Sequence, residues 1–372
     1  MENQAREALT DLVRQALAGL IRQAYSQPAR GWHNMAHLRR MAVALDFPPY
    51  MDKDYALAMK TAMYWHDFVY EPGSLDNEAK SEEAMRMVLK PTPVTEEAAR
   101  LIQATALPIT DAGYTLAGTE PESVFCAADW CGLDRTSDMD MQDMELLGAW
   151  ERGIQHEYGP NTRRYREGRM EFLQNAVERG FLSKAACDFV VYLMERPTRV
   201  AVYAGSFLPF HVGHYDIYMK ACRVFDHVVV ARGVNPDKRD ISHRWVRGDE
   251  PVAIESFGGM LVDYLHAWST EVGEQVTLVR GLRDGYDLMQ EFQFNQVLQD
   301  QAKHRGYPPV PIFYIRGDVG YQHVSSSVVR ALPEQERDLY LPRKWDWRAA
   351  LKAFVDTFGQ QEPEELDIFK EP

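Results

Sequence analysis

The chain has 372 residues, of which 45% are hydrophobic, and a length of this size predicts two domains with separate cores. Its formal net charge of −14 and the lack of a long basic run exclude an extended nucleic-acid-binding surface, because phosphate contacts need clustered lysine and arginine. No apolar stretch approaches the roughly 20 residues that cross a bilayer, so we expect a cytoplasmic protein without a membrane partner. Four cysteines without a C-x-x-C pair predict reduced, mostly buried thiols.

The first half of the chain shows helical periodicity almost throughout. Residues 1–25 place apolar side chains at helical spacing with charges between them, unlike the unbroken apolar core of a signal peptide. Long helical stretches such as YALAMKTAMYWHDFVY and KAACDFVVYLMERP follow, with few period-two alternations. The pattern predicts an all-α domain over residues 1–195.

The second half has a different pattern, which begins after Pro197. Short apolar strands are each followed by a glycine-bearing turn and a helical segment. This alternation predicts an α/β domain over residues 196–372, with a parallel sheet, helices on both faces, and C-terminal helices before an acidic tail. The hinge is the short segment ERPTR. The predicted strands are RVAVY, HVVVAR, VTLVRG and PIFYIRG.

The stretch GSFLPFHVGH directly follows the first predicted strand. We expect His214 in the first turn of the next helix, where free N–H groups and the helix dipole favour phosphate, and His211 faces the same place. Gly205 and Gly213 would let a ligand approach the main chain. The stretch resembles the [HT]-x-G-H signature of the nucleotidylyltransferase superfamily. Its members join a phosphate or phosphonate to the α-phosphate of ATP or CTP and release pyrophosphate.

Three further motifs follow in order: NPDKR, LVRGLRDGYDLMQEFQFN and YQHVSSSVVRAL. With FGGMLVDY, they make residues 199 to about 355 similar to the pantetheine-phosphate adenylyltransferase family, which forms dephospho-coenzyme A from ATP and 4'-phosphopantetheine. The resemblance implies a Rossmann-like fold, a Mg²⁺ ion that bridges the phosphates of ATP, small-molecule substrates and a homo-oligomer.

The same resemblance assigns roles to individual residues. Ser206, Lys238 and Arg280 would bind the acceptor phosphate, and His214 would bind the α-phosphate during transfer. Arg283 and the three serines of SSSVVR, Ser325 to Ser327, would bind the β- and γ-phosphates. Glu291 would lie near the nucleotide. Such a reaction needs alignment and charge neutralisation rather than a side-chain nucleophile. The expected catalytic residues are His211, His214, Lys238 and Arg283, and the expected substrate-binding residues are Gly205, Ser206, Phe207, Lys238, Met260, Arg280, Gly281, Arg283, Glu291, Ser325, Ser326, Ser327 and Arg330.

Departures from that family leave alternatives open. Leu208 stands where the family commonly has aspartate. His211 stands where the family more often has threonine, and is closer to nicotinamide or nicotinate mononucleotide adenylyltransferases. The segment between Lys238 and Phe257 lacks the family's helix, so the reaction type is better supported than the acceptor. The alternatives are a mononucleotide adenylyltransferase, another nucleotidylyltransferase, and a regulatory protein that binds nucleotide without transfer.

In the first half, RGWHNMAHLRRM, MYWHDFVYEPGSLDNEAKSEEAM and FCAADWCGLDR resemble the metal-dependent HD phosphohydrolase superfamily. The resemblance implies that His37, His66, Asp67 and Asp129 converge on one divalent cation, with His33 as a further partner. Imidazole and carboxylate suit Mn, Fe, Ni or Zn, or a less demanding Mg. Such an ion would lower the pKa of a bound water and polarise a phosphoryl oxygen.

Other residues bear on the same predicted metal site. Glu78 would orient water or a ligand. Leu107 stands where related proteins often have a further histidine, which leaves open a domain that no longer hydrolyses its ligand. Cys126 and Cys131 lie near Asp129, but their spacing puts them on different faces of a helix, so we expect both in the core.

Overall fold

The structure is a computed structural model and divides the chain into two units. The first unit is Met1–Tyr158, Arg169–Leu193 and Asp346–Pro372, and the second is Gly159–Gly168 and Met194–Trp345. The main segment of the second unit therefore begins next to the boundary predicted at residue 195. The structure describes residues 2–45, 47, 51–106, 121–130, 139–159, 162–178, 180, 182–234 and 245–363.

The described part of the chain before Val200 forms helices and contains no strand. Helix α3 has buried residues on every side, so it is the central helix of the first unit, and it leads directly into His66 and Asp67. Its start is fixed by Asp52, whose side chain accepts the backbone N–H of Tyr55 over 3.0 Å. The helices are α1 (Glu2–Tyr25), α2 (Met35–Leu45), α3 (Lys53–Trp65), α4 (Asn77–Val88), α5 (Pro93–Ala104), α6 (Pro121–Asp129), α7 (Met141–Tyr158), α8 (Arg163–Glu178) and α9 (Lys184–Met194).

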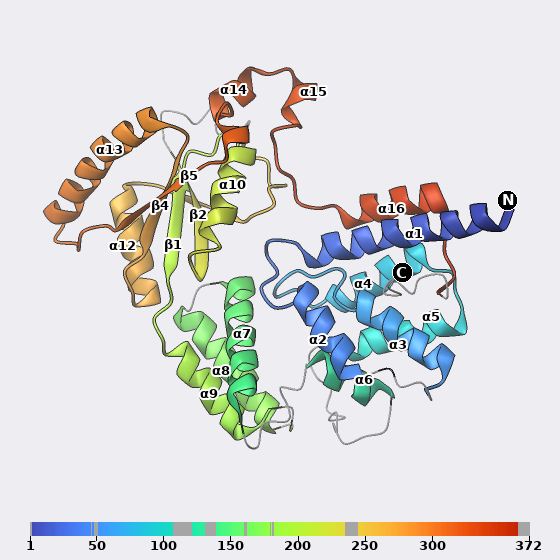
Figure 1. Ribbon diagram of the computed structural model, residues 1–372. Helices are drawn as coiled ribbons and strands as arrows, with labels where there is room; N and C mark the ends of the chain where they lie inside the picture. The colour runs from blue at the N-terminus through green and yellow to red at the C-terminus, as the bar shows by residue number, and fades with distance from the viewer. Residues whose placement is uncertain are drawn as a thin grey trace. The chain divides into compact units, whose positions relative to one another are not determined.

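The C-terminal helix α16 (Trp347–Phe358) belongs to the first unit, which corrects the prediction that residues 196–372 form one domain. It packs against α1 and α4 (Figure 1), with Leu351 and Phe354 buried. Arg348 also pairs with Glu83 of α4 over 2.8 Å. An amphipathic helix at the end of a chain shows which of its faces is buried but not which core covers that face. The acidic tail lies mostly outside the described residues.

A five-stranded parallel sheet forms the centre of the second unit, and its strand order is β3-β2-β1-β4-β5. The four predicted strands are present, in agreement with the expected α/β class. Strand β3 was not predicted, because its sequence IESF is short and half-exposed at the edge of the sheet. The strands are β1 (Val200–Gly205), β2 (His227–Gly233), β3 (Ile254–Phe257), β4 (Thr277–Leu282) and β5 (Ile312–Arg316).

Helices cover both faces of this sheet (Figure 1). Helix α10 (Val212–Ala221) packs its Ile217 and Ala221 on one face. Helices α12 (Leu261–Val272) and α13 (Gly285–His304) cover the other face. The short elements η2 (Val319–Tyr321), α14 (Ser326–Ala331) and α15 (Glu334–Arg337) follow β5. Within the described residues, no helix combines the length and the apolar character that crossing a membrane requires.

The strand order reverses between β1 and β4, which are neighbours in the sheet although two strands separate them in sequence. In open parallel sheets, ligands bind outside the carboxyl ends of the strands at such a switch point. The fold therefore places the segment after Gly205 and the segment after Leu282 at the most favourable position for a binding site.

Candidate functional sites

A cavity of about 350 Å³ lies at this switch point, between the carboxyl ends of β1, β4 and β5 and the beginnings of α10 and α14. Most of the predicted transferase residues line it, although they come from segments more than 100 residues apart. The predicted residues that line the cavity are Gly205, Phe207, His211, His214, Arg280, Gly281, Arg283, Glu291, Ser325 and Ser326.

His211 and His214 form a stacked pair in this cavity, with ring centroids 3.6 Å apart. The backbone N–H of His211 donates to Nδ1 of His214 over 3.3 Å, so neutral His214 carries its proton on Nε2. Burial lowers the pKa of His214 well below its usual value, and the neighbouring His211 and Arg283 lower it further. Burial and Arg283 lower the pKa of His211 to about 4. At neutral pH, both rings are uncharged and His214 can donate a hydrogen bond.

The two glycines of the motif make room for side chains. A Cβ on Gly205 would lie 2.8 Å from the ring of Phe207, and a Cβ on Gly213 would lie 3.2 Å from the imidazole of His211. Phe207 is buried, has a left-handed backbone with φ of 45°, and packs edge-on against His214 at a centroid distance of 4.9 Å. These contacts require glycine at both positions, and both glycines also line the cavity.

Carboxylates of α13 orient the two arginines of the cavity. Arg280 donates to both carboxylate oxygens of Glu291 over 2.6 and 2.7 Å, and its Nη1 donates to the carbonyl of Ala204 over 2.9 Å. Arg283 donates to both oxygens of Asp287 over 2.8 and 2.9 Å. A guanidinium has five N–H groups, so each arginine keeps at least two for a ligand.

The SSSVVR segment has a role in the fold that the sequence did not show. Ser325 caps α14 by accepting the backbone N–H of Val328 over 3.2 Å, and Ser326 donates to the carbonyl of Pro209 over 3.2 Å. Arg330 donates to the carbonyl of Leu208. These bonds tie α14 to the turn before α10.

The remaining predicted residues lie outside the lining of the cavity or outside the described residues. Ser206, Ser327, Arg330 and Met260 do not line the cavity, and Met260 is 37% exposed. Lys238 lies in the segment 235–244, outside the described residues. Sequence reasoning missed the part of the cavity wall that Gly317 and Asp318 form after β5, although the glycines of GDVGYQ indicate a turn there. It also assigned no role to Tyr203, Gln290, Tyr321 and Gln322, the last three of which lie within the quoted motifs.

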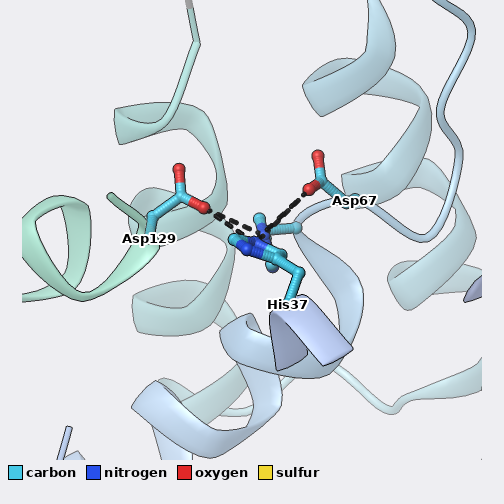
Figure 2. Close-up of side chains that lie close together, drawn as sticks. His37, Asp67 and Asp129 are labelled. Carbon is cyan, nitrogen blue, oxygen red and sulfur yellow. Dashed lines mark hydrogen bonds and ion pairs between the residues drawn. The ribbon is translucent and has the colours of Figure 1, made fainter. Parts of the chain in front are cut away.

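In the first unit, the four predicted metal ligands come together from three helices. His37 lies on α2, His66 and Asp67 follow α3, and Asp129 ends α6, yet one ligand atom of each lies within 4.8 Å of the others. Oδ1 of Asp129 is 3.0 Å from Nε2 of His37, and Oδ2 of Asp67 is 3.1 Å from Nε2 of His66. Figure 2 shows the carboxylates of Asp67 and Asp129 on opposite sides of the His37 ring.

The protonation of this cluster suits a cation. Nδ1 of His66 donates to the carbonyl of Met63 over 2.9 Å, and its Nε2 lies 3.2 Å from Nε2 of His37. Burial lowers the pKa of His66, but Asp67 and Asp129 raise it well above its usual value, so without a cation Nε2 carries a proton directed at these carboxylates. A cation bound here would take the place of that proton. Burial raises the pKa of Asp67 and Asp129, but the neighbouring imidazoles offset this effect and the pKa of each carboxyl falls below its usual range. Two ring nitrogens and two carboxylate oxygens thus converge at one point, which fits a divalent metal ion.

A second set of polar contacts lies beside this cluster, and sequence reasoning missed its central residue. Glu157 of α7 accepts the backbone N–H groups of Trp32 and His33 over 2.7 and 2.9 Å. The same carboxylate accepts Nδ1 of His33 over 2.8 Å and the hydroxyl of Tyr70 over 2.9 Å. Tyr70 also stacks on His33 at a centroid distance of 4.2 Å. A lone glutamate in a helix belongs to no motif, so nothing in the sequence distinguished it.

Three other predictions concern this part of the chain. Glu78 lies at the start of α4, where burial raises the pKa of its carboxyl and the charges of Asp67 and Asp129 raise it further. Cys126 is buried, as expected. Leu107 and Cys131 lie outside the described residues.

Comparison with known proteins finds similarity to enzymes named phosphopantetheine adenylyltransferase. The one from Heliobacterium modesticaldum is 33% identical over 171 residues, which cover 43% of this chain and 93% of the relative. The one from Geobacter sulfurreducens is 32% identical over 143 residues, or 36% of this chain and 81% of the relative. The one from Clostridium beijerinckii is 38% identical over 117 residues, or 28% of this chain and 70% of the relative. No protein-family model matches the chain.

Proposed function

Because the chain belongs to the phosphopantetheine adenylyltransferase family through part of its length, we propose that its second unit transfers the adenylyl group of ATP to 4'-phosphopantetheine. A phosphate oxygen of the acceptor attacks the α-phosphorus, the bond to the β-phosphate breaks, and pyrophosphate leaves. The observation that carries this proposal is the convergence of His214, Arg280, Arg283 and Ser326 on one cavity.

The residues of the cavity divide between the two substrates. The Nε2 proton of His214 hydrogen-bonds a non-bridging oxygen of the α-phosphate, where negative charge grows in the transition state. The free N–H groups of Arg283 and the hydroxyl of Ser325 bind the departing pyrophosphate, while Ser326, whose hydroxyl donates to the carbonyl of Pro209, holds the start of α14 beside it. Arg280, with Lys238, binds the phosphate of the acceptor. A Mg²⁺ ion bound to ATP would neutralise charge on its phosphates.

Leu208 does not weaken this proposal. Its side chain is 7% exposed and does not line the cavity, and its carbonyl accepts a hydrogen bond from Arg330. Leu208 therefore stabilises the turn before α10 through its backbone carbonyl, and its side chain has no contact with the cavity. His211, in contrast, lines the cavity and supports the second candidate, transfer to nicotinamide or nicotinate mononucleotide.

Pyrophosphate release over a panel of acceptors tests the reaction and the substrate together. We expect release from ATP with 4'-phosphopantetheine and none without an acceptor, and His214→Ala should lower it about 100- to 1,000-fold. Turnover with a pyridine mononucleotide but not with 4'-phosphopantetheine would show that the mononucleotide is the acceptor. Tight ATP binding without transfer to any acceptor would instead establish a regulatory binding protein.

The expected homo-oligomer is part of the same proposal. Helix α13 exposes a row of apolar side chains, with Tyr286 71%, Met289 62% and Phe292 49% exposed. Exposed apolar surface of this kind is typical of subunit interfaces. Light scattering of the protein as it elutes from a gel-filtration column should give the mass of several chains. The mass of one chain would contradict the expected homo-oligomer.

For the first unit we propose that His37, His66, Asp67 and Asp129 hold one divalent cation for phosphoester hydrolysis. Bound there, such an ion would activate water and polarise a phosphoryl oxygen. The buried set of facing nitrogen and oxygen ligands supports this proposal. Metal analysis should find about one ion per chain in the wild type and almost none in Asp129→Ala, with pyrophosphate release unchanged. A chain without metal, or one that binds metal but hydrolyses no phosphoester, would remove the proposed hydrolase activity.

A further inference from the structure

We propose that Asp216 is a positioning residue of the transferase site, which fixes the loop Gly317–Gln322 against α10. The inference rests on the proposed adenylyl transfer and deepens it. The loop forms one wall of the cavity through Gly317, Asp318, Tyr321 and Gln322. Neither the sequence motifs nor the similarity to other enzymes assigns a role to Asp216.

One carboxylate oxygen of Asp216 joins the helix to the loop. Its Oδ2 accepts the backbone N–H of Asp318 over 2.8 Å and Nζ of Lys220 over 2.8 Å. The same Nζ donates to the carbonyl of Arg316 over 3.1 Å. The pair therefore holds the chain on both sides of Gly317, where β5 ends and the loop begins.

The loop has internal bonds that make it a defined wall. Gly317 N–H donates to the carbonyl of Leu282 over 2.8 Å, at the end of β4. The side chain of Asp318 accepts the N–H of Gly320 over 2.8 Å, and its carbonyl accepts the N–H of Tyr321 over 3.0 Å. A movement of Asp318 would therefore move Tyr321 with it.

The position of Asp216 on α10 gives these contacts their functional meaning. His214 lies two residues earlier on the same helix and lines the same cavity. Asp216 thus fixes the position of the loop relative to His214, and both line the same cavity. Transfer between two anions depends on alignment, and a displacement of about 1 Å can cost about 100-fold in rate.

The chain offers a matched control for a test by substitution. Asp356 of α16 accepts Nζ of Lys352 over 2.8 Å with the same four-residue helical spacing, but belongs to the other unit. We expect Asp216→Ala to lower kcat about 10- to 100-fold and to weaken ATP binding, with the KM for the acceptor almost unchanged. Asp216→Asn keeps an oxygen for the N–H of Asp318 and should recover most of the rate. Asp356→Ala should behave as the wild type.

Amide hydrogen exchange provides a readout that does not depend on turnover. Peptides that cover the loop should exchange faster in Asp216→Ala than in the wild type or in Asp356→Ala. Wild-type kcat or wild-type exchange in Asp216→Ala would overturn the proposal. An Asp216→Asn variant as slow as Asp216→Ala would also overturn it, because the acceptor oxygen would then not be the group that matters.

The outcome is separable from failure of the proposed reaction. If the wild type makes no dephospho-coenzyme A, the reaction is wrong, and calorimetry with ATP still tests Asp216. Weaker ATP binding in Asp216→Ala would then support the positioning role. Equal affinities, or no ATP binding in either protein, would overturn it.

Discussion

The backbone N–H of His211 donates to Nδ1 of His214 over 3.3 Å, so the first turn of α10 decides which ring nitrogen of His214 carries the proton. In a neutral imidazole, an accepting Nδ1 leaves the proton on Nε2. The motif thus supplies an uncharged hydrogen-bond donor inside the cavity. The two histidines are one unit rather than two independent phosphate ligands.

Replacement of His214 by alanine removes that donor. A single donor to a developing negative charge is worth about 100- to 1,000-fold in kcat, and we expect a loss of that size in pyrophosphate release. His266 offers a control, because it stacks on Tyr307 at a centroid distance of 3.8 Å but does not line the cavity. His266→Ala should keep the wild-type rate. A His214→Ala enzyme within tenfold of the wild type would contradict the assigned role.

Acid should destabilise the second unit through His211. Its pKa falls to about 4 in the folded state, from 6.5 in the unfolded chain. Between these values the unfolded chain binds a proton that the folded protein does not, so stability is lost as the pH falls from 6.5 towards 4. Protonation of His211 should lower the free energy of unfolding by on the order of 3 kcal/mol over this range. In urea titrations over this range, His211→Gln should lose less stability than the wild type, and equal losses would contradict the burial argument.

The strands and the sites of this protein were predictable to different degrees. Val200 and Val228 lie in apolar runs, which both mark strands and fill the core, so local sequence sufficed. Strand β3 is short and at an edge, and α16 packs on the first unit, so both depend on contacts that no local pattern contains. The residues of GSFLPFHVGH lie together because the segment itself makes the turn.

Long-range partners were predictable only where a motif marked them. His37, Asp67 and Asp129 belong to recognisable segments, and the structure brings them together. Glu157 and Asp216 belong to no such segment, although each accepts hydrogen bonds from distant or backbone donors. Their roles come from acceptor geometry in the folded chain, which spacing along the sequence does not encode.

A chelator should destabilise the first unit and leave the second unchanged. An ion that binds only the folded state at 100 times its dissociation constant adds about 2.7 kcal/mol, which removal of the ion would reverse. The thermal midpoint of the wild type should therefore fall when metal is stripped and recover when Mn²⁺ or Zn²⁺ is added. Asp129→Asn should show neither change. Equal midpoints for stripped and loaded wild type would contradict a metal held by this cluster.

Glu157 should be among the most sensitive positions of the first unit. Its buried carboxylate accepts four hydrogen bonds, and Glu157→Ala would leave those donors without their acceptor. We expect a loss of about 3 to 5 kcal/mol in the free energy of unfolding, measured in urea. Glu145 is exposed on the same helix, so Glu145→Ala should cost about 0.5 kcal/mol or less. Similar losses in both variants would show that the contacts of Glu157 add little.

Arg280 should not tolerate lysine, although lysine keeps the charge. The guanidinium donates to both oxygens of Glu291 and to the carbonyl of Ala204, and a single ammonium group cannot reproduce that planar arrangement. Arg280→Lys should lower kcat/KM for the acceptor by about 10- to 100-fold, since a charge-assisted hydrogen bond is worth about 1.5 to 3 kcal/mol. Arg305 pairs with Asp263 over 2.7 Å outside the cavity, so Arg305→Lys is the control and should keep the wild-type value. If Arg280→Lys raised only the KM for ATP, Arg280 would be assigned to binding of the nucleotide rather than the acceptor.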